Sequence, residues 1–575
     1  MLPYQERYLK NVQEIAALFG ELKHSPEQQL QIAQLRKENN QLLNHNLFPA
    51  LDQLYNASAE TISGLEEFAG GLMDWSSNLD CGLYLTIHEA LLRLFRLRRD
   101  RNQVIKELYM VGMGLYYQSR SLQGISSAEV KAFHFRNEMV FTEAGSYLKF
   151  FEEIHDEETR GYIIRSLANI AICSEDLRRR VAISSRVLKI VQDDYYRSLA
   201  PSLPWDVFLR RTHQQMSSNR AVLSKGNLTA DELAAVLESC EEVFRPEEET
   251  DTPNIRWLWP YYEMEYSCGF ADLSTTLKRM ERLIGAASPE QTDYSGLYAN
   301  VQLPVYYGTL MRDNPALQTK PEHVRFLALA YGKMLHTLQN VHAEQFSDFF
   351  IYNICLVISD YYEMEGVPTY QEVTAQLMQQ LGGPLYIRSL RTGTLMRVFS
   401  SAVFDRDPEF FDDIEWLQAI QNTSEKRRTL EDFAEQCGLY HDFGLIKMNF
   451  ERICQTRDLF ENEQQLYELH AISGYDDLAA RASTVRYADI ALGHHRWYNG
   501  AGGYPKHYVR NNSPYRQMTD LCSICSFLSE KDSANFDDAV AEVLELEGKR
   551  FSPLLTAILA EPAVKEQLRE VFHTI

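Results

Sequence analysis

Apolar residues recur at steps of three and four along most of this 575-residue chain, and this spacing is the strongest constraint on its fold. Near the N-terminus the spacing is carried by Leu9, Val12, Ile15, Ala16, Phe19 and Leu22. Such steps place side chains on one face of an α-helix, whereas a half-buried β-strand requires strict alternation, which is scarce here. We therefore predict an all-α fold.

The residue pattern from about 90 to 200 predicts consecutive paired helices. One segment carries Gly145, Tyr147, Leu148, Phe150 and Phe151. The segment 162–171 contains small residues that allow two helices to approach closely, and a third segment spans 181–191. The pattern resembles tetratricopeptide-type repeats, although the signature residues do not keep a fixed period. We expect residues 1–375 to form a helical-hairpin array that senses or binds a protein partner.

Two breaks interrupt the predicted helices. The acidic stretch 245–253 contains two prolines and predicts either a solvated loop between helices or a sub-boundary near 245–254. The second break is Gly382-Gly383-Pro384, because glycine and proline together favour a turn. We therefore predict a second domain over residues 384–575.

The composition excludes several classes of function. Its 45% hydrophobic and 24% charged residues are those of a folded globular protein, and the net charge of −23 argues against nucleic acids and anionic membranes as partners. No apolar stretch approaches the ~18 residues of a membrane helix, and the N-terminus shows no secretory signal. The nine cysteines are scattered, which predicts free thiols in a reducing cytoplasm.

Cys522 and Cys525 form the one closely spaced cysteine pair. A four-thiolate zinc site would need a second such pair nearby, and none is present. Because the spacing is also that of one helix face, we expect both cysteines in a hydrophobic core. The sequence also lacks a Walker loop, a Rossmann glycine fingerprint, a His-Glu-x-x-His motif and a nucleophile elbow.

Histidines in the C-terminal third stand in three short motifs with glycine. The motifs are His441-Asp442 followed by Gly444, His470 followed by Gly474, and His494-His495 followed by Gly503-Tyr504-Pro505. Neutral imidazole and carboxylate are good ligands for divalent transition metals. A single histidine in a helix is usually an ordinary core or surface residue, and the chain has fifteen, so the inference depends on the three motifs together.

In this order the motifs resemble the HD-GYP family, a branch of the HD-domain metal-dependent phosphohydrolases, over roughly residues 384–575. The resemblance implies a helical bundle that holds one to three metal ions, usually iron or manganese, and hydrolyses cyclic di-GMP or a related cyclic dinucleotide in bacterial signalling. It implies catalytic roles for His441 and Asp442. The implied metal ligands are His441, Asp442, His470, His494 and His495, and the implied substrate loop contains Arg496, Gly503, Tyr504 and Pro505.

Several positions depart from the family pattern. Arg388 stands where the family has its first histidine, Leu445 where it has a lysine, Arg496 where it has a glutamate, and Ser526 where it has a late metal-binding aspartate. Asp520 could supply that last ligand only under a less natural alignment.

These substitutions divide the implied site into two halves. By resemblance, one metal position keeps Asp442 and the three later histidines, whereas the other depends on His441, Asp442 and the two missing ligands. A guanidinium at Arg388 would oppose a second divalent ion. We expect it to pair with Asp442 instead, because buried charges need partners. The site would then hold one metal ion or none.

Two functions follow. In the first, the protein is a cytoplasmic signalling phosphodiesterase whose N-terminal region senses a partner and whose C-terminal domain hydrolyses a cyclic dinucleotide or another phosphoester. In the second, that domain is catalytically degenerate and serves as a ligand-binding or protein-interaction module. The substitutions favour the second function, a domain without catalytic activity. The histidines that remain favour a retained metal or ligand pocket under either function. Neither function involves nucleic acid or a membrane, and both leave a homodimer open.

Overall fold

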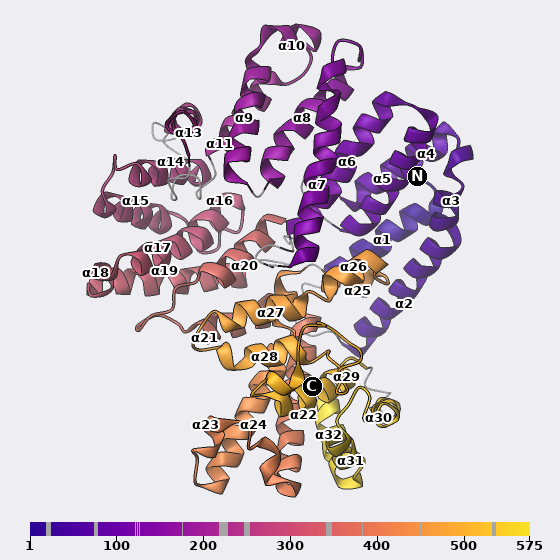
Figure 1. The fold of residues 1–575 in the computed structure, drawn as a ribbon, viewed down its shortest axis with the longest axis vertical. Helices are drawn as coiled ribbons and strands as arrows, with labels where there is room; N and C mark the ends of the chain where they lie inside the picture. Colours follow the sequence, from indigo (N-terminus) through magenta and orange to yellow (C-terminus); the bar gives the residue numbers. More distant parts are fainter. Residues whose placement is uncertain are drawn as a thin grey trace. The chain divides into compact units, whose positions relative to one another are not determined.

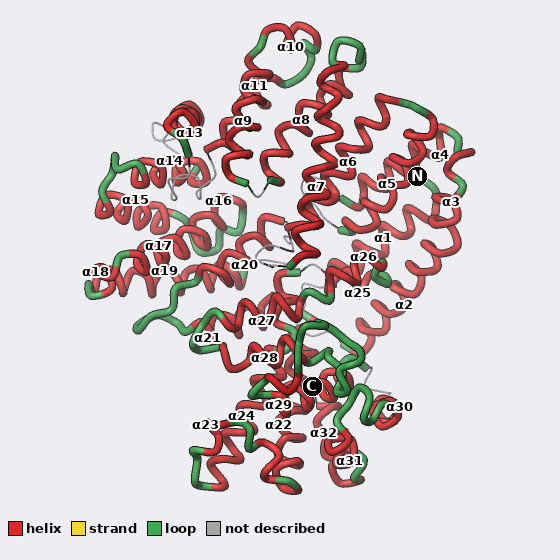
Figure 2. The backbone as a smooth tube through the Cα atoms, viewed as in Figure 1, coloured by secondary structure: helices red, strands yellow, loops and turns green. Residues whose placement is uncertain are grey.

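The computed structural model describes residues 1–574 except 19–24, 74–78, 121, 123–124, 126, 175, 218–227, 247–253, 341–347, 382, 449 and 532–535. This part of the chain is built from helices and contains no β-strand (Figure 1, Figure 2). The predicted all-α fold is therefore confirmed. Among the described helices, none is both long and apolar enough to cross a membrane.

The chain divides into two compact units. The N-terminal unit comprises Met1–Gln13 with Glu38–Val367, and the C-terminal unit comprises Glu14–Lys37 with Pro368–Ile575. The C-terminal unit thus begins before residue 384, where the sequence pattern placed its start. Helices α1 (Pro3–Leu18) and α2 (Pro26–Leu42) each contribute residues to both units. Phe19 and Leu22 of the first apolar pattern lie outside the described residues.

The described part of the N-terminal unit is a succession of helices. Its helices are α3 (Phe48–Asp52), α4 (Ala59–Leu72), α5 (Cys81–Arg98), α6 (Arg101–Arg120), α7 (Ala128–Ser146), α8 (Glu157–Cys173), α9 (Leu177–Gln192), α10 (Asp194–Leu199), α11 (Trp205–Ser217), α13 (Ala230–Val243), α14 (Ile255–Ser267), α15 (Leu273–Ala286), α16 (Tyr294–Leu297), α17 (Leu303–Asp313), α18 (Pro315–Gln318), α19 (Pro321–Gln339) and α20 (Asp348–Asp360).

Consecutive long helices of this unit pack on one another from α5 through α9 and on to α11 and α13. The side chains of Asp80, Ser127 and Asp156 cap the first turns of α5, α7 and α8, which separates one helix from the next. Helix α6 also packs on α8, so alternate helices form a row, as in a stacked hairpin array. A Cβ atom at Gly145 would lie 2.7 Å from the Leu167 side chain, so this glycine permits the close approach of α7 to α8.

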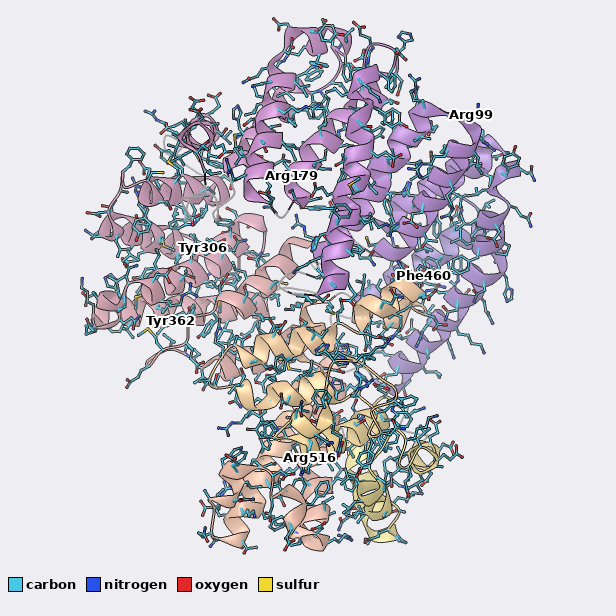
Figure 3. All side chains as sticks on the ribbon, viewed as in Figure 1. Arg99, Arg179, Tyr306, Tyr362, Phe460 and Arg516 are labelled. Carbon is cyan, nitrogen blue, oxygen red and sulfur yellow. The ribbon has the colours of Figure 1, made fainter. Side chains whose placement is uncertain are left out.

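The acidic loop does not separate the helices that flank it. Residues 247–253 lie outside the described residues, but α13 and α14 on either side pack on each other within one unit. Beyond the loop, aromatic side chains fill the spaces between helices. Tyr306 of α17, which is labelled in Figure 3, stacks on Trp259 of α14. Their ring centroids are 6.4 Å apart. Gly382 of the second break also lies outside the described residues.

The C-terminal unit is a helical bundle. Its helices are α21 (Tyr370–Leu381), α22 (Pro384–Arg406), α23 (Glu415–Gln418), α24 (Thr423–Tyr440), α25 (Phe450–Thr456), α26 (Glu461–Tyr467), α27 (His470–Ala479), α28 (Val485–Gly493), α29 (Arg516–Ser529), α30 (Phe536–Glu545), α31 (Pro553–Leu559) and α32 (Pro562–Thr574). Cys522 and Cys525 of α29 are fully buried free thiols, which confirms their predicted place in the core.

Helix α22 packs against α24, α29 and α32. Glycines set the closest of these approaches. A Cβ atom at Gly393 would lie 2.6 Å from the backbone oxygen of Glu435, and one at Gly438 would lie 2.5 Å from the Cα atom of Gly393. The backbones of α22 and α24 therefore come together where neither carries a side chain, which brings the start of α22 beside the end of α24.

Candidate metal centre

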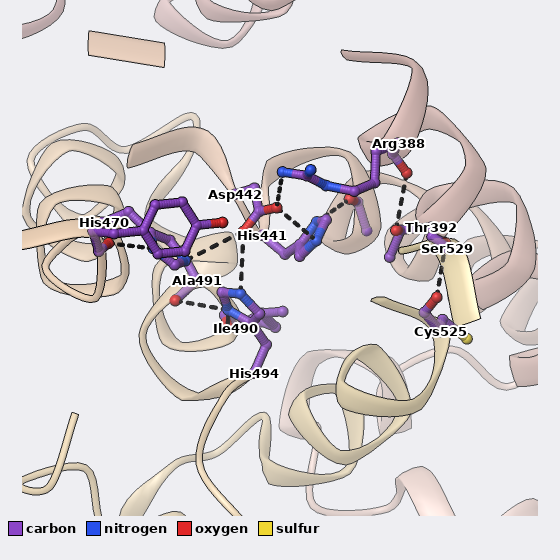
Figure 4. Close-up of polar contacts among 12 residues, drawn as sticks. Arg388, Thr392, His441, Asp442, His470, Ile490, Ala491, His494, Cys525 and Ser529 are labelled. Atoms are coloured by element: carbon purple, nitrogen blue, oxygen red, sulfur yellow. Dashed lines mark hydrogen bonds and ion pairs between the residues drawn. The ribbon is translucent and has the colours of Figure 1, made fainter. Parts of the chain in front are cut away.

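The carboxylate of Asp442 is surrounded by three imidazoles (Figure 4). Its Oδ1 atom lies 3.3 Å from Nε2 of both His470 and His494, and its Oδ2 atom lies 3.4 Å from Nε2 of His441. The exposed fractions of these four residues range only from 0% to 3%. Three motifs that are separate in the sequence thus meet at one buried carboxylate.

Helix ends position these side chains. His441 and Asp442 follow the last residue of α24, His470 is the first residue of α27, and His494 follows the last residue of α28. A Cβ atom at Gly444 would lie 2.1 Å from the backbone oxygen of His470. The glycine after His-Asp is therefore required because two backbones touch there, and this contact places Asp442 next to His470.

We expect the Gly444→Ala variant to lower the free energy of unfolding by about 1–3 kcal/mol, because the added methyl group overlaps backbone that cannot move away freely. Its affinity for manganese(II) should fall as well, since the overlap pushes α27 from Asp442. Urea unfolding and metal titration measure the two effects. The matched control is Gly332→Ala on α19, where a Cβ atom meets nothing within 4 Å. Equal effects of the two substitutions would contradict this account.

Backbone carbonyls orient the three imidazoles. Each Nδ1 atom lies within hydrogen-bond distance of a carbonyl oxygen of the preceding helical turn (Figure 4). The pairs are His441 with Gly438 at 2.7 Å, His470 with Tyr467 at 2.8 Å and His494 with Ala491 at 2.9 Å. Because a carbonyl only accepts, Nδ1 carries a proton, and in the neutral imidazole Nε2 then presents a lone pair to the centre. Histidines that bind metals are commonly oriented by hydrogen bonds of this kind.

The lone pairs at the centre have no protein donor. Nε2 of His441, His470 and His494 and Oδ1 of Asp442 make no hydrogen bond with any described residue. Acceptors that face one another in a buried site are costly unless a cation lies between them.

Four residues bring potential metal ligands together, namely Asp442, His470, His494 and His495. One ligand atom of each lies within 4.8 Å of those of the other three. Three imidazoles and one carboxylate suit a four-coordinate divalent transition metal. The side chains present therefore fit a metal ion.

Burial favours the neutral form of two of the imidazoles around Asp442. It lowers the pKa of His441 to about 4, against the opposing charge of Asp442. Burial also holds the pKa of His495 well below its ordinary value, and His494 and His470 contribute to the same direction. For Asp442, burial acts to raise the pKa, but the neighbouring histidines and Arg388 outweigh it and hold the pKa well below the usual range. These pKa values thus favour an ionised carboxylate at Asp442 and neutral imidazoles at His441 and His495, the forms that bind metals.

No protein-family model, curated protein or solved structure matches the chain. The description of this centre therefore depends on the positions of its own residues.

Arg388 occupies the other side of the carboxylate. Its NH2 atom donates to Oδ2 of Asp442 at 3.1 Å (Figure 4), which confirms the pairing expected from the substitution. His441 faces the same oxygen and does not belong to the group of four ligand atoms. The two oxygens of Asp442 therefore face different groups. Oδ1 faces His470 and His494, and Oδ2 faces Arg388 and His441.

Cys522 and Ser526 of α29, and Glu530 directly after its last residue, stand at four-residue steps, so all three lie on one face. Burial is the largest cause of the raised pKa values of Cys522 and Glu530, and the negative charge of Asp442 contributes to each rise, so both lie near it. Ser526 stands between them on the same face and is buried. Sequence comparison overlooked Glu530, although it stands one helical turn after Ser526.

Two further positions singled out in the sequence, Asp520 and Leu445, do not contribute a ligand or a cation to the centre. Asp520, the alternative for the missing aspartate, forms an ion pair with Arg510 instead, with Nε and Oδ1 2.7 Å apart. Leu445 is buried, and Lys447 two residues later forms an ion pair with Asp477 at 2.6 Å. The site thus lacks both the second aspartate and a free lysine in this turn.

The glycine-rich loop lies against His470 and His495. The Tyr504 ring packs on the His495 ring with centroids 4.5 Å apart and meets His470 edge-on at 5.9 Å. Arg496 donates to the carbonyl oxygens of Gly502 at 2.9 Å and Gly503 at 3.1 Å. Arg496 therefore holds the loop in shape, and Tyr504 is the loop side chain that lies beside the ligand group.

Proposed function

We propose that the C-terminal unit is a divergent HD-GYP-like phosphohydrolase domain that acts on a phosphodiester with one divalent metal ion. One observation carries the proposal, namely the convergence of ligand atoms from Asp442, His470, His494 and His495. Among these, Oδ1 of Asp442 and Nε2 of His470 and His494 have no hydrogen-bond donor among the described residues. Iron(II) and manganese(II) are the ions that the resemblance implies, and three imidazoles with one carboxylate suit both.

Different residues around Asp442 would bind the metal ion and the phosphate group of the substrate. Asp442, His470, His494 and His495 would hold the ion, which when bound supplies Lewis-acid activation of a phosphoryl oxygen and of water. Arg388 would donate to a second phosphate oxygen, because a guanidinium matches phosphate geometry and its side chain is 18% exposed. Catalytic roles for His441 and Asp442 remain part of this proposal.

The substrate class of the proposal is a cyclic dinucleotide of the cyclic di-GMP type or another phosphodiester. Support comes from the motif order together with the position of Tyr504, whose ring lies over His495 beside the ligand group. An aromatic ring at this place suits a nucleobase or another planar group. The negative charge of the whole chain makes the local cations, the metal ion and Arg388, decisive for an anionic ligand.

A second candidate function is a binding module that does not hydrolyse its ligand. The ion pair between Arg388 and Asp442 favours it, because a guanidinium beside Oδ2 opposes the second divalent ion of a two-metal mechanism. In this candidate the metal ion and Arg388 hold a phosphate group and no bond breaks.

The deciding experiment combines metal analysis with a turnover assay on the full-length chain. Protein loaded anaerobically with manganese(II) or iron(II) is analysed for metal content and then incubated with cyclic di-GMP or bis-p-nitrophenyl phosphate. One metal ion per chain with turnover that depends on it supports the proposal. One metal ion with cyclic di-GMP binding and no turnover of either substrate supports the second candidate. Absence of bound metal would contradict both.

We expect the double variant Arg388→His with Ser526→Asp to bind two metal ions per chain instead of one. The first substitution removes the cation beside Oδ2 and adds an imidazole. The second adds a carboxylate between Cys522 and Glu530, two positions whose pKa values the charge of Asp442 raises. Metal analysis after gel filtration measures the ratio. Arg388→Gln is the control, since it removes the charge without adding a ligand and should leave the ratio at one. A ratio of one in the double variant would contradict the role assigned to Arg388.

A further inference from the structure

A pocket of about 640 Å³ lies within the N-terminal unit, far along the chain from the metal centre. Helices α4, α5, α6, α8 and α11 contribute its lining. Of these, α6 packs on α8 and α8 on α11, so the pocket follows the row of alternate helices in the array. Its volume falls within the range of small-molecule sites, about 300–1,000 Å³.

Aromatic rings line much of this pocket. Tyr109 and Tyr162 pack with ring centroids 5.1 Å apart, and the Tyr84 ring packs on the His88 ring at 4.3 Å. Phe208 of α11 is also part of the lining. Rings that are fixed by their neighbours offer a flat apolar surface at little cost in side-chain entropy, which favours a planar ligand.

The charged side chains of the lining are mostly cations, in contrast to the chain as a whole. They are Lys106, Arg165 and Arg211, with Glu66 as the one carboxylate among the described lining residues. Lys106 pairs with Glu66 at 2.8 Å. Neither Arg165 nor Arg211 forms an ion pair with a described residue. In a protein with a net charge of −23, two arginines left for a ligand in one pocket favour an anion.

Arg165 is held in place for such a contact. Its guanidinium carbon lies 5.6 Å from the Tyr162 ring centroid and 5.7 Å from that of Phe208. Packing against two rings limits the rotamers of the side chain, so little entropy is lost when it binds a carboxylate or sulfonate. The positive charges of Arg165 and Arg211 both act on the Tyr109 hydroxyl, which places them near the same ring.

A buried histidine adds a further polar group. His88 lines the pocket and is 4% exposed, and its Nδ1 atom lies 2.7 Å from Oε2 of Glu107. Glu107 is fully buried, so it fixes the orientation of the imidazole ring. The Nε2 atom of His88 makes no hydrogen bond with the described part of the chain and is left for a polar group of a ligand.

From these features we infer that the pocket binds a small organic anion that carries an aromatic ring. The rings of Tyr84, Tyr109 and Tyr162 contact the planar part, and Arg165 and Arg211 bind the acidic group. The inference concerns the N-terminal unit alone and does not depend on the metal centre or on the function proposed for it.

The test uses two fluorescent probes that share an aromatic skeleton and differ in charge. Anilinonaphthalene sulfonate carries a sulfonate group, and N-phenyl-naphthylamine does not. Titrated into the full-length chain, the sulfonate should bind at least about tenfold more tightly than the neutral probe, and added salt should reduce the difference. Equal affinities, or no binding of the sulfonate, would overturn the inference.

Variants locate the binding in the pocket. Arg165→Gln and Arg211→Gln should each weaken binding of the sulfonate about tenfold and leave the neutral probe unchanged. The matched control is Arg186→Gln, which removes an exposed arginine of α9 outside the pocket and should change neither affinity. Circular dichroism melting verifies that each variant is folded. If both pocket variants bind the sulfonate like the native chain, the inference is wrong.

Discussion

We expect the Asp442→Asn variant to bind manganese(II) about 100-fold more weakly than the native chain, or not at all. The carboxylate lies at the centre of the ligand group, with Oδ1 3.3 Å from Nε2 of both His470 and His494. An amide of the same shape removes the negative charge that a divalent ion needs. Loss of a residue that merely orients a ligand already costs about 10–100-fold in metal affinity, so loss of a central ligand should cost at least as much.

Two measurements check this expectation. Isothermal titration of the metal-free protein gives the affinity, and thermal melting with and without manganese(II) gives the stabilisation by the ion. An ion at 100 times its dissociation constant should stabilise the native chain by about 2.7 kcal/mol, and the variant by far less at the same concentration.

The control is Asp432→Asn, which changes an aspartate on the same helix α24. Its side chain is 53% exposed and lies 3.6 Å from Arg397, away from the ligand group. This control should bind manganese(II) like the native chain. If Asp442→Asn binds manganese(II) with unchanged affinity, Asp442 is not a metal ligand and the proposed metal centre is wrong. An equal loss of affinity in both variants would indicate general unfolding.

A second large effect is expected when Arg457 is replaced by methionine. Its side chain is fully buried and makes paired contacts with Glu463, from NH1 to Oε2 at 2.7 Å and from NH2 to Oε1 at 2.8 Å. The guanidinium carbon also lies 3.8 Å from the ring centroid of Phe460, which is labelled in Figure 3. Because the substitution leaves the buried carboxylate of Glu463 without its arginine, it should lower the free energy of unfolding by about 3–5 kcal/mol.

Urea unfolding of the full-length chain measures this loss. The double variant Arg457→Met with Glu463→Gln should recover part of the stability, because it removes both buried charges rather than one. Arg428→Met is the exposed control, since its side chain is 82% exposed and lies 4.0 Å from Asp432. It should change the free energy of unfolding by no more than about 0.5 kcal/mol. A small effect of Arg457→Met would show that the pair contributes little.

Features that depend on local spacing could be predicted from the sequence. The steps of three and four in the apolar pattern predicted helices, and the structure has helix α1 over Pro3–Leu18 and helix α8 over the small residues of 162–171. The same reasoning placed Cys522 and Cys525 in the core of α29. Such patterns are readable because a helix repeats every 3.6 residues whatever surrounds it.

Features assembled from distant segments could not be read in this way. The pocket of the N-terminal unit takes its lining from five helices, and no short motif marks Arg165 or Arg211 as neighbours. The proximity of Glu530 to Asp442 likewise depends on how α29 packs in the bundle. Side chains that share no local pattern come together only through packing, so a single sequence carries no signal for them.

At the metal centre, the sequence alone determined which residues could serve as ligands, because imidazole and carboxylate groups are set by residue type. It also suggested, from the resemblance, that Arg388 pairs with Asp442. The tertiary structure decided which oxygen of Asp442 faces which group. Oδ1 faces His470 and His494, and Oδ2 faces Arg388. The physical reason is the close backbone contact of α22 with α24 at Gly393 and Gly438, which brings the start of one helix to the end of the other.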